Sequence, residues 1–271
     1  MVVKYDLVLM NPPYNNGLWF KFLEKAAELS DTVASVNPDP LDRVRFMEKV
    51  SDNKALSRKF KDYCVANGLQ HRITATHHFP DIVGGKISAF VFDRNKGYNP
   101  AVLDGDPLVD ILSKVILGEF VAEVYQGKTR HEPGTGTMCV ANAGNHLVME
   151  ETAEPHREKF KGDHFIVNRF FGFKANSPVY RINMSNKALS GNCIAYKSAK
   201  GETIDGFKSV YLSTLYRAAI KFLKGGYNNV DPMHLKMLPH LDLSRVWTDA
   251  ELYQHYGLTQ SEIDVIEHYV E

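Results

Sequence analysis

The first hundred residues alternate between short apolar runs and amphipathic stretches. Residues 3–10, VKYDLVLM, form a near-continuous apolar run, which predicts a strand buried on both faces of a parallel sheet. Two prolines end the run, because neither can donate a hydrogen bond to a strand ladder. Residues 18–29 then have helical spacing, with Asn15 and Asn16 as cap candidates. The predicted buried face of this helix carries Trp19, Phe22, Leu23 and Ala26.

Strand and helix patterns continue in alternation. Residues 32–36 predict a short strand, and residues 54–67 predict a helix that ends at Gly68. Residues 70–76 and 86–92 predict two further strands, joined by a turn-rich segment. Such alternation indicates an α/β layered architecture.

The predicted α/β unit spans residues 1–97 as half of a doubly wound sheet, and the pattern changes after it. Residues 98–118 predict a linker and a bridging helix. Between residues 119 and 271, short alternating runs separated by glycine, asparagine and proline predict a mostly β region with C-terminal helices. A helix is expected near residues 211–223. The tail contains two capping boxes, Thr248 with Glu251 and Thr259 with Glu262.

Composition narrows the possible classes of protein. Lysine plus arginine and aspartate plus glutamate number 32 each, which argues against a positive surface for non-specific nucleic-acid binding but allows a local basic cleft. The three cysteines form neither a disulfide framework nor a zinc pattern, and His77-His78 lacks partnering carboxylates, so no metal is expected. The chain has neither a membrane span nor the form of a signal peptide, and we expect a soluble, cytoplasmic protein.

The most informative residues are Asn11-Pro12-Pro13-Tyr14, directly after the first predicted strand. By average residue usage, this tetrapeptide occurs by chance in a chain of this length about once in a thousand. Ligands of open α/β sheets bind at the carboxyl ends of the strands, where these residues are expected to lie. The structural alternative is a proline turn followed by a buried tyrosine.

These residue types suit chemistry on an aromatic amine. The lone pair of such a nitrogen is delocalised into the ring, and two acceptors aimed at its hydrogens favour the pyramidal, nucleophilic form. The Asn11 side-chain oxygen and the Pro12 carbonyl can supply both acceptors, with the prolines fixing the direction of the carbonyl. Tyr14 offers a flat face for an extruded base.

The segment resembles the catalytic motif of S-adenosylmethionine-dependent amino-methyltransferases, and the chain resembles their DNA adenine-specific, restriction–modification branch. Looser similarity covers most of the chain, in LWFKFLEKAAEL, TVASVNP, FPDIVGGKISAFVFDRN and GGYNNVDPMHLKMLPHLDLS. The resemblance implies a partial Rossmann-like methyltransferase sheet followed by a target-recognition region. It also implies methyl transfer to the N(6) amine of adenine in DNA, with Asn11 and Pro12 orienting the amine, Pro13 completing the motif and Tyr14 stacking on the base.

In this family a glycine-rich turn and an acidic residue hold the S-adenosylmethionine, and both normally precede the catalytic motif. Only ten residues precede Asn11 here, and the glycine-containing segments 170–173 and 224–227 lack the required spacing. The donor site is therefore expected to be incomplete, leaving VKYDLVLM as an exposed apolar edge. We expect a second polypeptide to supply the missing strands, unless the chain covers the edge in another way.

For each remaining candidate residue the sequence allows both a functional and a purely structural role. Arg169 and Lys174 lie in a segment, 154–181, that interleaves basic and aromatic residues, as a DNA-facing surface or a half-buried strand would. Asn37 either borders the base pocket or belongs to a plain turn, and Phe79 either lines that pocket or joins the core. Two other functions stay open. They are a non-catalytic DNA-binding or inhibitory protein derived from a methyltransferase, and a methyltransferase acting on protein glutamine or RNA.

Overall fold

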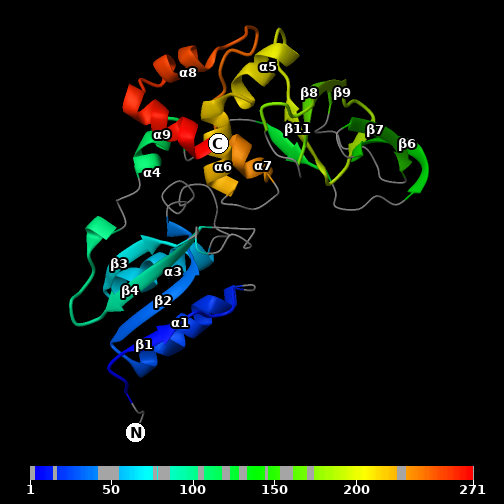
Figure 1. Ribbon diagram of the computed structural model, residues 1–271. Helices are drawn as coiled ribbons and strands as arrows, with labels where there is room; N and C mark the ends of the chain where they lie inside the picture. Colours follow the sequence, from blue (N-terminus) through cyan, green and yellow to red (C-terminus); the bar gives the residue numbers. More distant parts are fainter. Residues whose placement is uncertain are drawn as a thin grey trace. The chain divides into compact units, whose positions relative to one another are not determined.

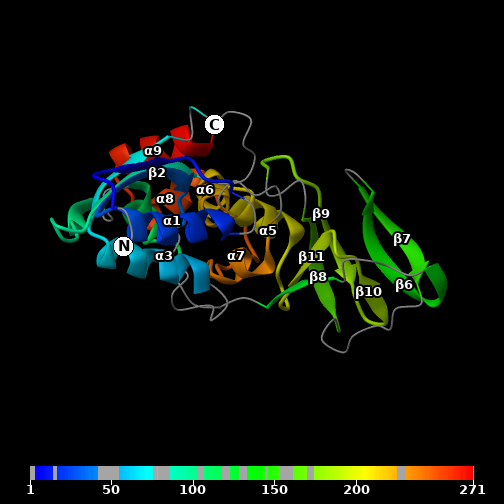
Figure 2. The ribbon, with the colours of Figure 1, turned by 90° about the horizontal axis from the view of Figure 1, so that it is seen from below.

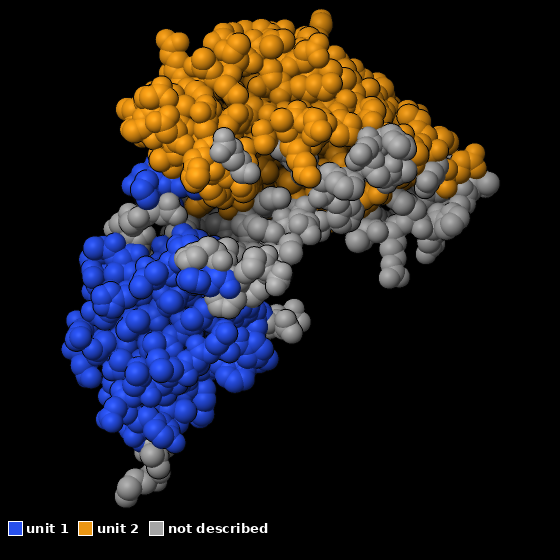
Figure 3. Space-filling model, in the orientation of Figure 1, with its two compact units in different colours: residues 1–110, 225–227 blue, residues 111–224, 228–271 orange. Residues whose placement is uncertain are grey.

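Two compact units make up the chain. Unit 1 contains residues 1–110 with 225–227, and unit 2 contains residues 111–224 with 228–271 (Figure 3). The computed structural model describes residues 4–14, 17–41, 55–75, 78, 86–102, 107–117, 123–127, 133–143, 146–152, 161–169, 174–224 and 230–270. The predicted α/β class is confirmed, because helices and several sheets share the chain.

Unit 1 is built on a four-stranded sheet with the order β1-β2-β4-β3 (Figure 1). The strands are β1 (Val8–Met10), β2 (Thr32–Pro38), β3 (Leu69–Thr74) and β4 (Ile87–Asp93). β1 pairs in parallel with β2, whereas β4 runs antiparallel to both β2 and β3. β1, β2 and β3 therefore point the same way, and their carboxyl ends lie at one end of the sheet. A short 3-10 helix, η3 (Pro100–Val102), follows β4.

Helices α1 (Leu18–Leu29) and α3 (Ala55–Ala66) cover one face of this sheet. One apolar cluster joins side chains of both helices to Val33 of β2 and Phe90 of β4. The bounds of α1 match the prediction, but its buried face is shifted. Phe20 is buried and Phe22 is 47% exposed, because the stripe centres on Leu23 and leaves Phe22 on its flank. The predicted caps Asn15 and Asn16 lie outside the described residues, and Gly17 is the N-cap residue.

The opposite face of the sheet is open in the described part of unit 1. Leu9 pairs with Ala34, which points away from the helix-covered side of β2. Leu9 is 73% exposed, Leu7 47% and Ile73 64%. The prediction of a first strand buried on both faces is wrong: β1 has three residues and lies at the sheet edge, where none of the described strands pairs with its outer side. The expected exposed apolar edge is present.

Unit 2 contains two sheets, which Figure 2 shows near one another. One has the order β10-β6-β7 and the other β5-β11-β8-β9. A core cluster with Val140, Ile166 and Cys193 joins them. All pairs are antiparallel except β10 with β6. The strands are β5 (Val124–Gln126), β6 (Pro133–Ala143), β7 (His146–Thr152), β8 (Asp163–Asn168), β9 (Val179–Asn183), β10 (Lys187–Leu189) and β11 (Cys193–Lys197).

Helices follow the sheets of unit 2. They are α5 (Ile204–Tyr211), α6 (Thr214–Lys224), α7 (Pro232–Lys236), α8 (Asp249–His255) and α9 (Gln260–Val270), while α4 (Pro107–Leu112) precedes the sheets. The helix predicted near residues 211–223 is α6, which begins at Thr214 because the Ser213 hydroxyl accepts from the Tyr216 amide at 3.2 Å. The preceding α5 was not predicted. Both predicted capping boxes are confirmed by reciprocal hydrogen bonds, Thr248 with Glu251 and Thr259 with Glu262.

None of the described helices is both long enough and apolar enough to cross a membrane.

Gly68 ends α3 as predicted, in a left-handed conformation with φ of 64°. A Cβ placed there would lie 2.3 Å from the Asp93 carbonyl oxygen, whereas a Cβ at Gly97, with φ of 73°, would meet nothing within 4 Å. We expect Gly68→Ala to lower the free energy of unfolding by about 3 kcal/mol and Gly97→Ala by about 1 kcal/mol, since only the first adds a backbone clash to the conformational penalty. Urea unfolding of both variants measures the difference. Equal losses would show that the close approach to Asp93 is unimportant.

Candidate functional site

Asn11-Pro12-Pro13-Tyr14 begin directly where β1 ends, at the carboxyl end of the parallel strands. Asn11 and Pro13 are exposed, while Pro12 is buried. Tyr14 is half-buried and its ring packs against the core cluster of unit 1. Residues 11–14 therefore form a bend with one side packed in the protein and one side open to solvent.

The Tyr14 hydroxyl ties this bend to the next strand. It lies 2.8 Å from Asn11 Oδ1 and 3.3 Å from the Val36 carbonyl oxygen. Val36 is one residue beyond Ser35, which pairs with Met10 at the end of β1. Burial raises the pKa of Tyr14, so the hydroxyl keeps its proton at neutral pH and acts as a donor.

Two oxygens of the bend, Asn11 Oδ1 and the Pro12 carbonyl, can accept further hydrogen bonds. Within the described residues no donor reaches the Pro12 carbonyl, and Asn11 Oδ1 receives only the Tyr14 hydroxyl. An amide oxygen has two lone pairs, so Asn11 can accept a second hydrogen bond. The ring of Pro12 restricts the backbone that carries its carbonyl. This arrangement can accept both hydrogens of a primary amine beside the tyrosine ring.

Asn37 does not face the open side. It is 0% exposed, and its Oδ1 accepts from the Ser35 hydroxyl at 2.6 Å, while its Nδ2 donates to the Pro38 carbonyl at 3.4 Å. Both ends of the Asn37 side-chain amide therefore form hydrogen bonds to residues of β2.

A buried charge network lies at the same end of the sheet and was not predicted from the sequence. The Asp39 carboxylate, just after β2, accepts from Arg72 Nε of β3 at 2.8 Å and from the Ser88 hydroxyl of β4 at 2.5 Å. The Leu41 amide donates to its other oxygen at 3.1 Å. The side chains of Arg72 and Asp39 are 7% and 0% exposed. The network thus joins β2, β3 and β4 at the end of the sheet where the bend lies.

Three predicted site residues remain. Phe79 is outside the described residues. Arg169 and Lys174 belong to unit 2. Arg169 is half-buried and its Nε donates to the Val230 carbonyl at 3.3 Å, whereas Lys174 is exposed. The structure brings Asn11 and Tyr14 together with the end of β2.

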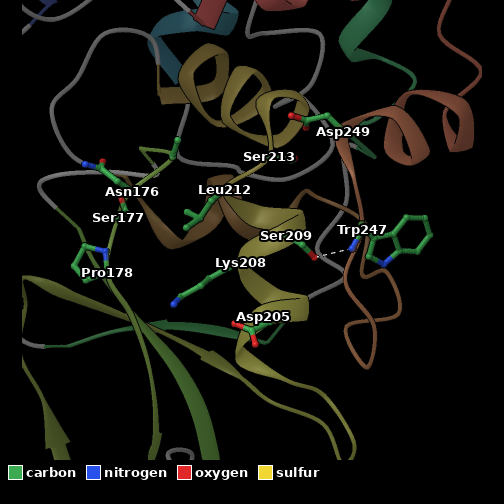
Figure 4. Close-up of a pocket in the computed structure, with 11 residues that line it drawn as sticks. Asn176, Ser177, Pro178, Asp205, Lys208, Ser209, Leu212, Ser213, Trp247 and Asp249 are labelled. Carbon is green, nitrogen blue, oxygen red and sulfur yellow. Dashed lines mark hydrogen bonds between the residues drawn. The ribbon is translucent and has the colours of Figure 1, made fainter.

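Unit 2 contains an open groove of about 530 Å³, shown in Figure 4. Lys208 of α5 is half-buried in its wall, and no described carboxylate lies within ion-pair distance of it. Asp249 is already engaged, since its oxygens accept from the amide and hydroxyl of Thr214 at 2.9 Å each. The other lining residues are Ala175, Asn176, Ser177, Pro178, Asp205, Ser209, Leu212, Ser213 and Trp247.

Among the described residues, no three histidine, cysteine or carboxylate side chains gather where they could hold a metal ion. Cys64, Cys139 and Cys193 are all buried free thiols. Burial raises the pKa of Cys193 to about 12, which keeps this thiol protonated and unreactive.

Comparisons with known proteins find similarity in solved structures alone. No family model matches the chain, and no curated protein matches it. The fold is similar to a chain in the structure of the Type IIL restriction-modification enzyme MmeI in complex with DNA, with a TM-score of 0.42 and 11% sequence identity. The match covers 98% of this chain and 53% of that one, so the chain spans about half the length of the matched protein.

The buried pair generates a stability prediction. We expect Arg72→Met to lower the free energy of unfolding by about 3 kcal/mol, because the Asp39 carboxylate would stay buried without its cation. The double variant Arg72→Met with Asp39→Asn removes both charges and is expected to recover part of that loss. Chemical denaturation compares the two. A double variant less stable than the single one would contradict this account.

Proposed function

We propose that unit 1 is the amine-binding half of a methyltransferase that modifies the exocyclic N(6) amine of adenine in DNA. The observation that carries the proposal is the bend after β1, where the exposed Asn11 meets the Tyr14 hydroxyl through its side-chain oxygen and no described donor reaches the Pro12 carbonyl. These groups match the needs of an aromatic amine held flat against a ring. The resemblance of the motif to adenine-specific enzymes supports the same reading.

The residues of the bend act on the acceptor. Asn11 and Pro12 accept the two amine hydrogens, which draws the lone pair out of conjugation with the purine ring. S-adenosylmethionine, when bound, would supply the methyl group. The bend would present the amine nitrogen with its lone pair free to accept that group, and the nitrogen would afterwards release one proton to water. Tyr14 holds the extruded base by stacking. A strong general base is unnecessary, since the proton becomes acidic once nitrogen carries the methyl group.

The donor half is proposed to join the sheet at β1. The described residues of unit 1 provide neither a glycine-rich turn after a buried strand nor a ribose-binding carboxylate beside one, so they do not fit S-adenosylmethionine by themselves. The outer edge of β1 and the open face with Leu7 and Leu9 are the surfaces that additional strands and helices would cover. Strands added in parallel there would end beside Asn11, at a switch point of the sheet.

Methyl transfer tests the proposal directly. With the full chain isolated together with any polypeptide bound to it, we expect transfer of radiolabelled methyl from S-adenosylmethionine to adenine-containing DNA. Asn11→Ala should lower kcat at least about 100-fold, because a preorganised polar contact to the reacting group is lost. Asn95→Ala, at an exposed asparagine in the turn after β4, is the matched control and should keep wild-type activity.

Three other outcomes of this experiment would contradict the proposal in different ways. DNA binding without transfer to any adenine would favour a non-catalytic DNA-binding protein. Labelling of a glutamine-containing protein or of RNA, with unlabelled DNA, would move the acceptor to that class. Full activity of Asn11→Ala would overturn the role given to the bend.

Unit 2 is proposed to contact the DNA backbone. Lys208 is a cation without a described ionic partner in a groove whose lining includes serine and asparagine side chains, groups that bind phosphate oxygens, together with the carboxylates of Asp205 and Asp249. Lys174 lies close in sequence to Ser177 of the groove wall and donates its amide to the Ser177 hydroxyl at 2.8 Å. With a net charge of zero over the chain, binding depends on such local cations.

We expect Lys208→Ala to weaken DNA binding at all sequences and to reduce the slope of log affinity against log salt by about 1, since one phosphate contact and its counterion are lost. Fluorescence anisotropy across a salt series measures both quantities. Lys200→Ala removes an exposed lysine elsewhere in unit 2 and should leave the slope unchanged. Equal slopes for both variants and the wild type would remove Lys208 from the interface.

A further inference from the structure

One feature of the bend conflicts with a simple acceptor role for Asn11. The oxygen that would receive an amine hydrogen already receives the Tyr14 hydroxyl at 2.8 Å. A carbonyl oxygen that accepts a strong hydrogen bond has less electron density for a second donor. The amine would therefore meet a partly occupied acceptor.

A second acceptor lies within reach of the same hydroxyl. The Val36 carbonyl oxygen is 3.3 Å from Tyr14 Oη, so the two acceptors lie 2.8 Å and 3.3 Å from one donor. A tyrosine has a single hydroxyl hydrogen and can direct it fully to one acceptor at a time. The shorter contact to Asn11 takes precedence while no other donor approaches that oxygen.

We propose that the Tyr14 hydroxyl is a positioning group for Asn11, and that it passes its hydrogen bond to the Val36 carbonyl when the amine binds. This inference rests on the proposed function of the bend. In the empty site the hydroxyl donates to Asn11 and holds the carboxamide with its oxygen toward that hydroxyl. In the occupied site the amine takes that oxygen, and the hydroxyl keeps a partner in Val36.

The direction of the carboxamide decides whether the amine is attracted. An asparagine side chain has an oxygen and an NH₂ group of nearly equal size at its end, and rotation by half a turn exchanges them. Turned the wrong way, Asn11 would point an N–H at the N–H of the amine, which is repulsive. Asn11 is exposed and lacks other described partners, so the hydroxyl is the contact that selects the productive orientation.

The exchange avoids leaving a polar group unsatisfied. The Tyr14 hydroxyl lies in a half-buried position where a missing partner would cost about 1–3 kcal/mol. Transfer to the Val36 carbonyl avoids that loss. The ring of Tyr14 stays packed against the core throughout, so its flat face remains in place for the base.

Tyr14→Phe separates the hydroxyl from the ring. We expect kcat for DNA methylation to fall about tenfold while KM for DNA stays unchanged, because the base still stacks but Asn11 loses its preferred orientation. Tyr63→Phe is the matched control, since it removes a buried hydroxyl that donates to the Leu23 carbonyl at 2.9 Å away from the bend. It should lower stability without lowering kcat.

A measurement on the free chain keeps this proposal apart from the proposed function. In nuclear magnetic resonance spectra, the side-chain NH₂ signals of Asn11 should shift in Tyr14→Phe and stay in place in Tyr63→Phe. Unmoved Asn11 signals, or a Tyr14→Phe enzyme with raised KM and unchanged kcat, would overturn the positioning role. Shifted signals in a protein that never methylates DNA would overturn the proposed function and, with it, the transfer of the hydrogen bond to Val36.

Discussion

A three-residue parallel pairing holds the first strand on its sheet. Val8, Leu9 and Met10 pair with residues 33–35 of β2, and the bend with Asn11 begins at the next residue. Since β1 has no other strand neighbour in the described chain, the register of this short ladder sets the position of Asn11 along β2. The Tyr14 hydroxyl and the packing of its ring then fix the far end of the bend.

Local sequence patterns predicted the elements whose stability is local. The bounds of α1, the end of α3 at Gly68 and both tail capping boxes follow from side-chain periodicity and capping chemistry within a few residues. Helix α5 was not predicted, and the predicted start of α6 near residue 211 is early, because apolar residues continue through Leu212 and hide the break that Ser213 makes.

Long-range contacts were beyond the reach of the sequence. Arg72 and Asp39 are 33 residues apart, and only the folded order of β2, β4 and β3 brings them together. The apolar run of the first strand gave the residue types of a buried strand, yet burial depends on what lies beside it. Asn11 and Tyr14 could be singled out from their motif, whereas the contact of Tyr14 with Val36, 22 residues away, required coordinates.

The bare edge of β1 also bears on how the protein is handled by a cell. An unpaired strand with alternate apolar side chains is a template for any extended peptide, including the same strand of a neighbouring molecule. A second polypeptide that joined this edge, as proposed, would compete with homotypic aggregation, and the competition would be one of encounter rates. Chaperone shielding of residues 5–9 before such a partner arrived would favour assembly over precipitation.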